Sequence, residues 1–219
     1  MPTIEKSHII QLPAMIESKQ DIQIIYYYLK KLFKCSFKLC YFGNHIFNPK
    51  LIELLFGEAK QFYVENCNIT TQSYNIEILL QFMLNNLASK YHLIRLHHMN
   101  YDVIMKYKDD LFKILSSGGD KFGKVYVEFR SRPNFYMEFY NDFVEFVATS
   151  NLSKMVPVIS LGFCGLGLKN FKLNEKAINI KTKEVSTTYQ VDNIHDPNVK
   201  VTFCNEGEQY FVKVTIMKE

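Results

Sequence analysis

The sequence predicts an α/β chain in which short strands alternate with amphipathic helices and a mostly β segment follows. Strand-like alternations of apolar and polar residues recur at nearly constant spacing. Those that begin at Ile94, Val125 and Ile159 follow the one at Phe62 after successive steps of 32, 31 and 34 residues. The segments between them carry apolar residues three and four positions apart, which is the period of a helix that buries one face. After Asn151 the helical period stops.

Each predicted strand has the period-two alternation of a half-buried strand. The step from Phe37 to Phe62 is shorter than the later ones, at 25 residues. The predicted strand cores are residues 37–39, 62–65, 94–97, 125–128 and 159–161.

Amphipathic helices are predicted around and between these strands. Asn48 and Pro49 suit the N-cap and first position of a short helix, and Gly118 suits the end of another. The predicted helices cover residues 21–34, 49–56, 75–90, 102–116 and 135–149.

The carboxyl-terminal part reads as strands joined by turns. Strands are predicted at residues 178–180, 199–203 and 210–216, and residues 205–208 read as the turn between the last two. We therefore expect an N-terminal extension over residues 1–20 and a single domain over residues 21–219, of which residues 151–219 are mostly β.

A period of 20 to 50 residues is typical of repeat architectures. Strand–helix units in series give parallel strands with helices on one face, so the predicted fold is leucine-rich-repeat-like. Only part of the repeat signature is present, because the regular leucine ladder is missing. At the position where a repeat has a strict Asn or Cys, five residues after Phe62 and Ile94, this sequence has Cys67 and Met99, so the match is partial. The alternative is an ordinary α/β sandwich with helices on one or both faces of the sheet.

Composition excludes several classes of protein. Of the 219 residues, 47% are hydrophobic and 15% aromatic, with 9 Gly and 6 Pro, which excludes disordered and collagen-like chains. The balance of 26 Lys and Arg against 22 Asp and Glu is too even to indicate nucleic acid. No apolar run approaches the ~20 residues that span a bilayer, and no signal peptide is visible. With 5 irregularly spaced cysteines, reduced thiols in the cytoplasm or nucleus fit best.

The motifs that could support catalysis or cofactor binding are weak. Residues 118–124 resemble a phosphate-binding loop, but Val125 replaces the hydroxyl residue and a strand, not a helix, follows. Gly162, Gly165 and Gly167 reverse the dinucleotide pattern and precede no helix. The His97–His98 and Cys35–Cys40 pairs lack further ligands. We therefore expect no enzyme, no cofactor and no metal, although an enzyme with a site dispersed in sequence remains an alternative.

What remains is the sheet face that the helices leave open. If the apolar residues of the strands face the helices, their alternate residues share the other face. Tyrosine and arginine are enriched at protein interfaces, which favours a binding role for this face. The alternative is a solvated sheet face with stabilising cross-strand pairs. The predicted protein-binding residues are Tyr63, Glu65, Arg95, His97, Tyr126 and Glu128, with Lys38, Ser160 and Asn179 beside them.

Several segments resemble a known family. They are residues 24–55, 148–150, 153–159, 171–173, 175–177, 189–190 and 193–200, and they are similar to the large F-box protein family of plant-parasitic root-knot nematodes. In F-box proteins an N-terminal F-box binds the Skp1 adaptor of a cullin–RING (SCF) ubiquitin ligase, and the following region captures a target. The resemblance therefore implies a substrate-recognition region.

The sequence departs from this family at its start. Leu12-Pro13 stands without the surrounding pattern of an F-box, so Skp1 is an expected partner only if an F-box lies upstream. The alternative is a nematode effector-like protein that binds a host protein without ligase coupling. In both cases the target is a protein of unknown identity.

Overall fold

The computed structural model describes residues 16–42, 47–58, 60–71, 76–97, 101–130 and 133–218. The chain divides into two compact units, residues 1–35 and 36–219. Leu12 and Pro13 lie outside the described residues.

The described part of the first unit contains helix α1, Lys19–Leu32. It begins two residues earlier than predicted because Ser18 and Asp21 form a reciprocal capping box. The Ser18 hydroxyl accepts from the Asp21 amide at 3.2 Å, and the Asp21 carboxylate accepts from the Ser18 amide at 2.9 Å. Such a pair satisfies backbone donors that the first helical turn leaves free.

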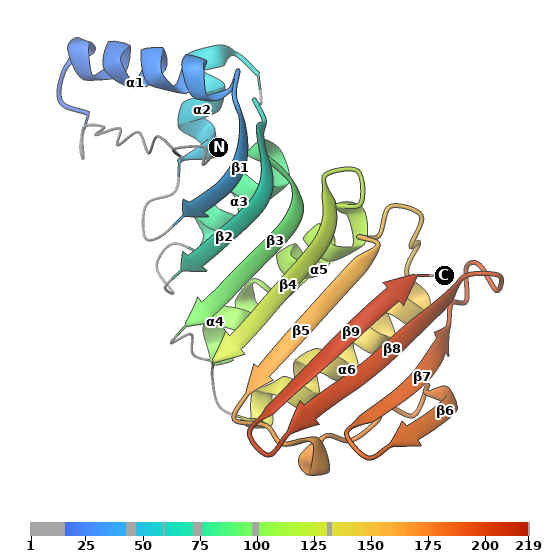
Figure 1. Cartoon of the computed structure of the whole chain (residues 1–219). Coiled ribbons are helices and arrows are strands. Elements are labelled where there is room, and N and C mark those ends of the chain that lie inside the picture. The colour runs from blue at the N-terminus through green and yellow to red at the C-terminus, as the bar shows by residue number, and fades with distance from the viewer. Residues whose placement is uncertain are drawn as a thin grey trace, which may run out of the picture. The chain divides into compact units, whose positions relative to one another are not determined.

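In the described part of the second unit, nine strands form one sheet in the order β1-β2-β3-β4-β5-β9-β8-β7-β6 (Figure 1). Strands β1 to β5 are parallel, and the remaining pairings are antiparallel. The strands are β1 Ser36–Phe42, β2 Phe62–Thr71, β3 Leu87–His97, β4 Phe122–Arg130, β5 Val158–Cys164, β6 Ile178–Lys183, β7 Ser186–Asp192, β8 Lys200–Glu208 and β9 Phe211–Lys218. The prediction of an α/β chain with parallel strands and a mostly β end is confirmed.

Helices connect the parallel strands. They are α2 Pro49–Phe56, α3 Ile76–Asn86, α4 Tyr101–Lys106, α5 Lys108–Ser117 and α6 Pro133–Thr149, and a short 3₁₀ turn, η2, follows at Leu168–Asn170. In Figure 1, α3, α4, α5 and α6 lie behind the sheet, and the described residues of this unit place no helix on the face toward the viewer. We call that uncovered side the open face. No helix in the described residues is long and apolar enough to cross a membrane.

The parallel strands share one packing pattern on their helix side. In β1 to β4 a buried or half-buried residue is followed by a second one three positions later and by a third two positions after that. Strand β5 contributes only the second and third of these positions. The three sets align across the strands as Phe37, Val64, Ser89 and Phe122; Cys40, Cys67, His92, Val125 and Ile159; and Phe42, Ile69, Ile94, Val127 and Leu161. Strict alternation would put every second residue on the helix side, so a step of three interrupts it. The interruption falls at aligned positions in β1 to β4. At these positions a Cβ on Gly123 would lie 2.9 Å from the Lys90 carbonyl oxygen, so glycine permits the close approach.

Aromatic side chains fill the space between the sheet and α5 and α6. Phe112 of α5 packs against Phe139 and Phe143 of α6 with ring centroids 5.2 Å apart in both pairs. Phe129 of β4 stacks on Phe163 of β5 at 5.5 Å. Phe112, Phe139 and Phe143 are at most 4% exposed, so the apolar faces predicted for these helices are buried.

Several further predicted elements differ from the structure. Helix α3 ends at Asn86 rather than at residue 90, because Leu87 and Ser89 already pair in the sheet. The predicted helix over residues 102–116 is two helices, separated at Tyr107. Residues 205–208 belong to β8 and not to a turn, because buried Asn205 pairs with Val214; the chain reverses at residues 209–210. Strand β7 was not predicted.

Candidate binding surface on the open sheet face

The open face carries rows of side chains that align across adjacent strands. Because side chains alternate along a strand, these residues lie between the buried helix-side ones. From β2 to β5 the rows are Asn66, Tyr91, Lys124 and Val158; Asn68, Leu93, Tyr126 and Ser160; and Thr70, Arg95, Glu128 and Gly162. One step farther along, Arg130 ends β4 and Cys164 ends β5.

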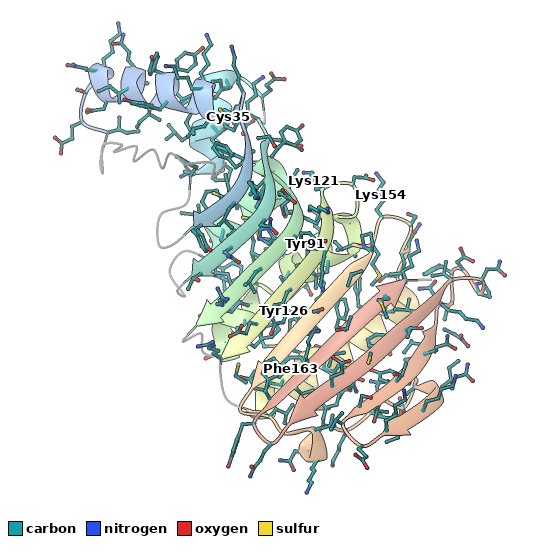
Figure 2. The ribbon with its side chains drawn as sticks, in the orientation of Figure 1. Cys35, Tyr91, Lys121, Tyr126, Lys154 and Phe163 are labelled. Atoms are coloured by element: carbon teal, nitrogen blue, oxygen red, sulfur yellow. The ribbon has the colours of Figure 1, made fainter. Side chains whose placement is uncertain are left out.

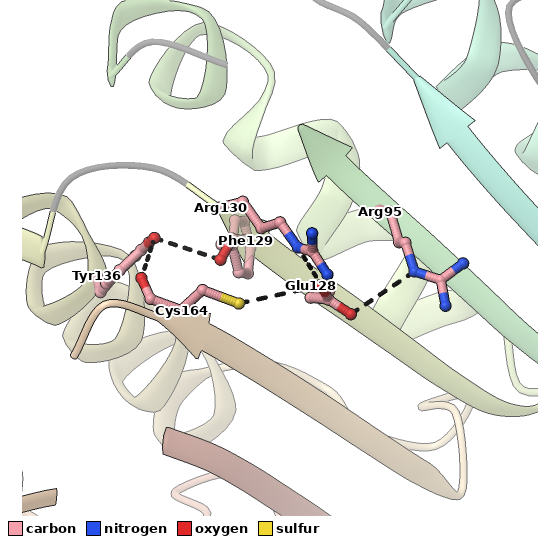
Figure 3. A network of polar contacts seen from close by, with 6 residues as sticks. All are labelled: Arg95, Glu128, Phe129, Arg130, Tyr136 and Cys164. Carbon is pink, nitrogen blue, oxygen red and sulfur yellow. Dashed lines mark hydrogen bonds and ion pairs between the residues drawn. The ribbon is translucent and has the colours of Figure 1, made fainter. Parts of the chain in front are cut away.

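The centre of this surface is the carboxylate of Glu128, which is only 8% exposed as a residue (Figure 3). Arg130 donates from Nε to Oε1 of Glu128 at 2.5 Å. Arg95 of the neighbouring strand places its Nε 3.7 Å from Oε2. A largely buried carboxylate is costly unless it is paired, and the two guanidinium groups supply that pairing.

Cys164 borders the same cluster but is not activated as a nucleophile. Its Sγ lies 4.0 Å from Oε1 of Glu128 (Figure 3). Burial, and then the negative charge of Glu128, raises the pKa of the Cys164 thiol. A thiol whose pKa is raised is mostly protonated at neutral pH and is a poor nucleophile.

Tyr136 of α6 fixes the ends of the two strands from the helix side. Its hydroxyl contacts the Phe129 carbonyl oxygen at 3.3 Å and the Cys164 carbonyl oxygen at 2.9 Å (Figure 3). Tyr136 is fully buried. The backbone beneath Glu128 and Cys164 is therefore held in place by a buried side chain from the opposite face.

Tyr126 lies across the neighbouring strand, over a glycine. A Cβ on Gly162 would lie 2.4 Å from the Tyr126 hydroxyl oxygen and 3.0 Å from its ring. Burial, with a further contribution from Glu128, raises the pKa of Tyr126 to about 12. The glycine thus makes room for the ring, which is one reason for a glycine inside a strand.

A shallow depression lies beside this cluster. The side chains of Tyr91 and Tyr126, from neighbouring strands, border it, and Tyr91 is 45% exposed (Figure 2). Its other open-face residues are Leu39, Asn66, Asn68, Leu93 and Lys124. We call this depression the tyrosine hollow. It combines apolar rings with side-chain amides that can donate and accept hydrogen bonds.

The predicted binding residues do not form one patch. Arg95, Tyr126 and Glu128 lie together, whereas Tyr63, which is 54% exposed, and Glu65 border a second depression near the amino ends of the strands. Tyr63 aligns with Ala88 in β3, seven residues before Arg95, which corresponds to roughly 23 Å along the strand. The side chain of His97 lies outside the described residues.

Two corrections concern exposure. Glu128 was predicted as an exposed contact residue, but it is buried between two arginines, because its carboxylate recruits both cations. Ser160, predicted beside it, is 1% exposed. Glu128 therefore positions arginine side chains and offers little surface of its own.

The sequence interpretation missed the tyrosine hollow and Arg130. Extending the third helix to residue 90 concealed the first part of β3, so Tyr91 was not assigned to a strand. The glycine inside β5 was a usable signal, because an isolated glycine in a strand often marks a close approach by another group. Arg130 follows the predicted strand core by two residues and could have been placed by continuing the alternation.

Other titratable groups lie on the helix side. Cys40, Cys67 and His92 align on three adjacent strands, and burial raises the pKa of both thiols and lowers the pKa of His92 to about 3. Within the described ranges no three His, Cys, Asp or Glu side chains are grouped so that they could hold a metal ion. Gly118 follows α5 and leads into β4, the element order that the sequence predicted.

The loop after β7 holds the end of α6 through side-chain contacts. Asn193 donates from Nδ2 to the carbonyl oxygens of Val147 at 2.6 Å and Ser150 at 2.8 Å. The His195 ring nitrogen Nε2 lies 2.6 Å from the Thr149 carbonyl oxygen. These side chains satisfy carbonyl groups at the end of α6, so this segment stabilises the fold.

Part of the chain is similar to a known protein family. Residues 2–97 match a family model described as a domain of unknown function, DUF8381. This match spans less than half of the 219 residues and ends at the last residue of β3, so it includes Tyr91 and Arg95 but not Tyr126, Glu128 or Arg130. No curated protein and no solved structure matches the chain.

Proposed function

We propose that this protein is a non-enzymatic protein-binding module whose target docks on the open face of β1 to β5. On the resemblance described above, its role is substrate recognition in SCF-type ubiquitin ligation. The observation that carries the binding proposal is the uncovered sheet face, where the tyrosine hollow lies directly beside Arg95, Glu128 and Arg130, which we call the arginine cluster.

The residue types on this face favour protein contact. Tyrosine and arginine are enriched at the centres of protein interfaces, because each offers a large contact area together with a polar group. Tyr91 and Arg130 are about half exposed, with 45% of the residue and 53% of the side chain accessible, respectively. A side chain that is already partly ordered loses less entropy on binding than a fully mobile one.

The packing pattern supports a leucine-rich-repeat-like architecture for β1 to β5. The leucine-rich repeat has apolar residues at L-x-x-L-x-L, followed three positions later by Asn or Cys. The aligned helix-side residues follow the same spacing, as in Phe122, Val125 and Val127 of β4. In β5 the position three residues after Leu161 is occupied by Cys164, whereas β4 has Arg130 there. Cys67 lies in the strand at an earlier position of this pattern.

The first experiment asks what the protein captures. The tagged full chain is incubated with nematode and host-plant extracts, and bound proteins are identified by mass spectrometry. Recovery of Skp1 together with a target supports the ligase role. A target without Skp1 favours the effector-like alternative, and the absence of any saturable partner contradicts the binding proposal.

The second experiment locates the surface with three single tyrosine variants. Tyr91→Ala alters the tyrosine hollow, Tyr63→Ala alters the depression near the amino ends, and Tyr210→Ala alters the turn before β9, where the tyrosine is 70% exposed. We expect Tyr91→Ala to weaken binding of the captured target by about tenfold, as for a moderate hot spot, and Tyr210→Ala to leave it unchanged. Titration calorimetry measures the affinities. Equal affinities for all three variants would place the target elsewhere.

A further inference from the structure

In the arginine cluster, both guanidinium groups contact Glu128 through Nε and keep other N–H donors available. Arg95 and Arg130 both approach Glu128 through Nε, at 3.7 Å and 2.5 Å. Figure 3 shows the terminal amino groups of Arg95 directed away from this carboxylate. The planar guanidinium group carries five N–H donors. Arg130 uses part of them on Glu128 and on Cys164, and Arg95 approaches Glu128 through Nε, so terminal donors remain for a second anion.

The local charge balance is positive. Arg95, Arg130 and Lys124 contribute three positive charges to this part of the open face, and the only carboxylate in its aligned rows from β2 to β5 within the described residues is Glu128. That carboxylate is 8% exposed and already paired. An incoming carboxylate would therefore meet two pre-oriented guanidinium groups, which favours its binding. Beyond β5 the same row continues to Lys213 and Glu206, which form an ion pair with each other.

The tyrosine hollow adjoins the cluster along the strands. Leu93 and Tyr126 stand two residues before Arg95 and Glu128, which is about 7 Å in an extended strand. This equals the distance between alternate side chains of an extended peptide. A peptide laid along these strands can therefore place one apolar side chain in the hollow and a carboxylate side chain at the arginines.

We propose that the open face recognises an acidic peptide segment of the target, with a carboxylate between Arg95 and Arg130 and a neighbouring apolar side chain in the tyrosine hollow. This inference rests on the proposed function, since it specifies the chemistry of the protein that docks there. Asn66 and Asn68 border the hollow. Asn66 donates from Nδ2 to the Lys38 carbonyl oxygen at 3.2 Å, so its side-chain oxygen and the Asn68 amide are the groups offered to the backbone of such a segment.

The test uses the full chain and a phage library that displays random twelve-residue peptides. Peptides enriched by the wild-type protein should contain Asp or Glu close to an apolar or aromatic residue. A synthetic copy of an enriched peptide should lose about tenfold in affinity when its acidic residues are replaced by the corresponding amides. Enrichment without acidic residues, or affinity unchanged by these replacements, overturns the proposal.

A matched pair of protein variants locates the contact. The triple variant Arg95→Gln, Glu128→Gln and Arg130→Gln removes the cluster without leaving a buried carboxylate unpaired, and it lowers the net charge by one. Lys183→Gln, in exposed β6, lowers the net charge by the same amount away from the cluster. We expect the triple variant to bind the enriched peptide at least about tenfold more weakly than the wild type, and Lys183→Gln to bind it with unchanged affinity. Equal weakening would show a general charge effect and overturn the proposal.

The same variants separate this inference from the proposed function. If a captured target binds the triple variant as well as the wild type but loses affinity for Tyr91→Ala, acidic recognition is wrong and protein binding on this face stands. If neither an enriched peptide nor a protein target binds the wild type, both proposals fail.

Discussion

At the scale of single residues, the buried Glu128 is the feature that organises the candidate surface. A carboxylate at 8% exposure must be compensated, and its two partners come from β3 and β4. The carboxylate therefore determines where both guanidinium groups lie. Removal of its partners should cost more than removal of the entire cluster, because an unpaired buried charge is more costly than an uncharged site.

This difference is measurable by urea denaturation. We expect Arg95→Gln with Arg130→Gln to lower the free energy of unfolding by about 2 kcal/mol, a figure that is below the usual cost of breaking a buried pair because both arginines are partly exposed. Adding Glu128→Gln to this double variant should recover at least half of the loss. A triple variant less stable than the double variant would contradict the idea that Glu128 needs its charged partners.

At the scale of the elements, the helix-side row that contains His92 brings a titratable group into the core. His92 is 2% exposed, and burial lowers its pKa from 6.5 to about 3. The Ser89 hydroxyl lies 3.2 Å from Nδ1, while Nε2 has no hydrogen-bond partner. The ring is therefore held neutral where β3 packs against its neighbours.

The sign of the resulting pH dependence follows from linkage. As the pH falls below 6.5, His92 becomes protonated in the unfolded chain but stays neutral in the folded protein. The free energy of unfolding therefore decreases until the pH reaches about 3, where the folded ring is protonated as well. Between pH 7 and pH 5 this contribution amounts to a loss of about 2 kcal/mol. His92→Gln should lose less stability than the wild type over the same interval, measured by urea denaturation at both pH values. Parallel losses in the two proteins would contradict the assignment.

At the scale of the whole second unit, one sheet connects a parallel half and an antiparallel half. The junction is the pairing of β5 with β9, in which Ile159 aligns with Ile216, and both side chains are fully buried. The Tyr140 and Tyr189 hydroxyl groups also contact each other, which joins α6 to β7. Because the same core continues through the junction, we expect the two halves to unfold together.

A substitution at the junction tests this cooperativity. Ile216→Ala should lower the free energy of unfolding by about 3 kcal/mol, the usual cost of a large-to-small change in a core. Native-state hydrogen exchange should then show reduced protection in both β3–β4 and β7–β8. Loss of protection confined to β7–β9 would show that the halves unfold separately.

The sequence by itself determined the elements whose signals are local. Helix α2 has the predicted bounds, residues 49–56. They follow from Asn48, Pro49 and the apolar spacing after them, because capping and helical periodicity act within a few residues. The apolar residues of the strands likewise indicated which face of the sheet packs against the helices. Only the tertiary structure decided that β3 begins at Leu87, that Glu128 is buried, and that Tyr63 lies far from Arg95. These properties depend on strand register and on charges contributed by neighbouring strands, which local periodicity does not encode.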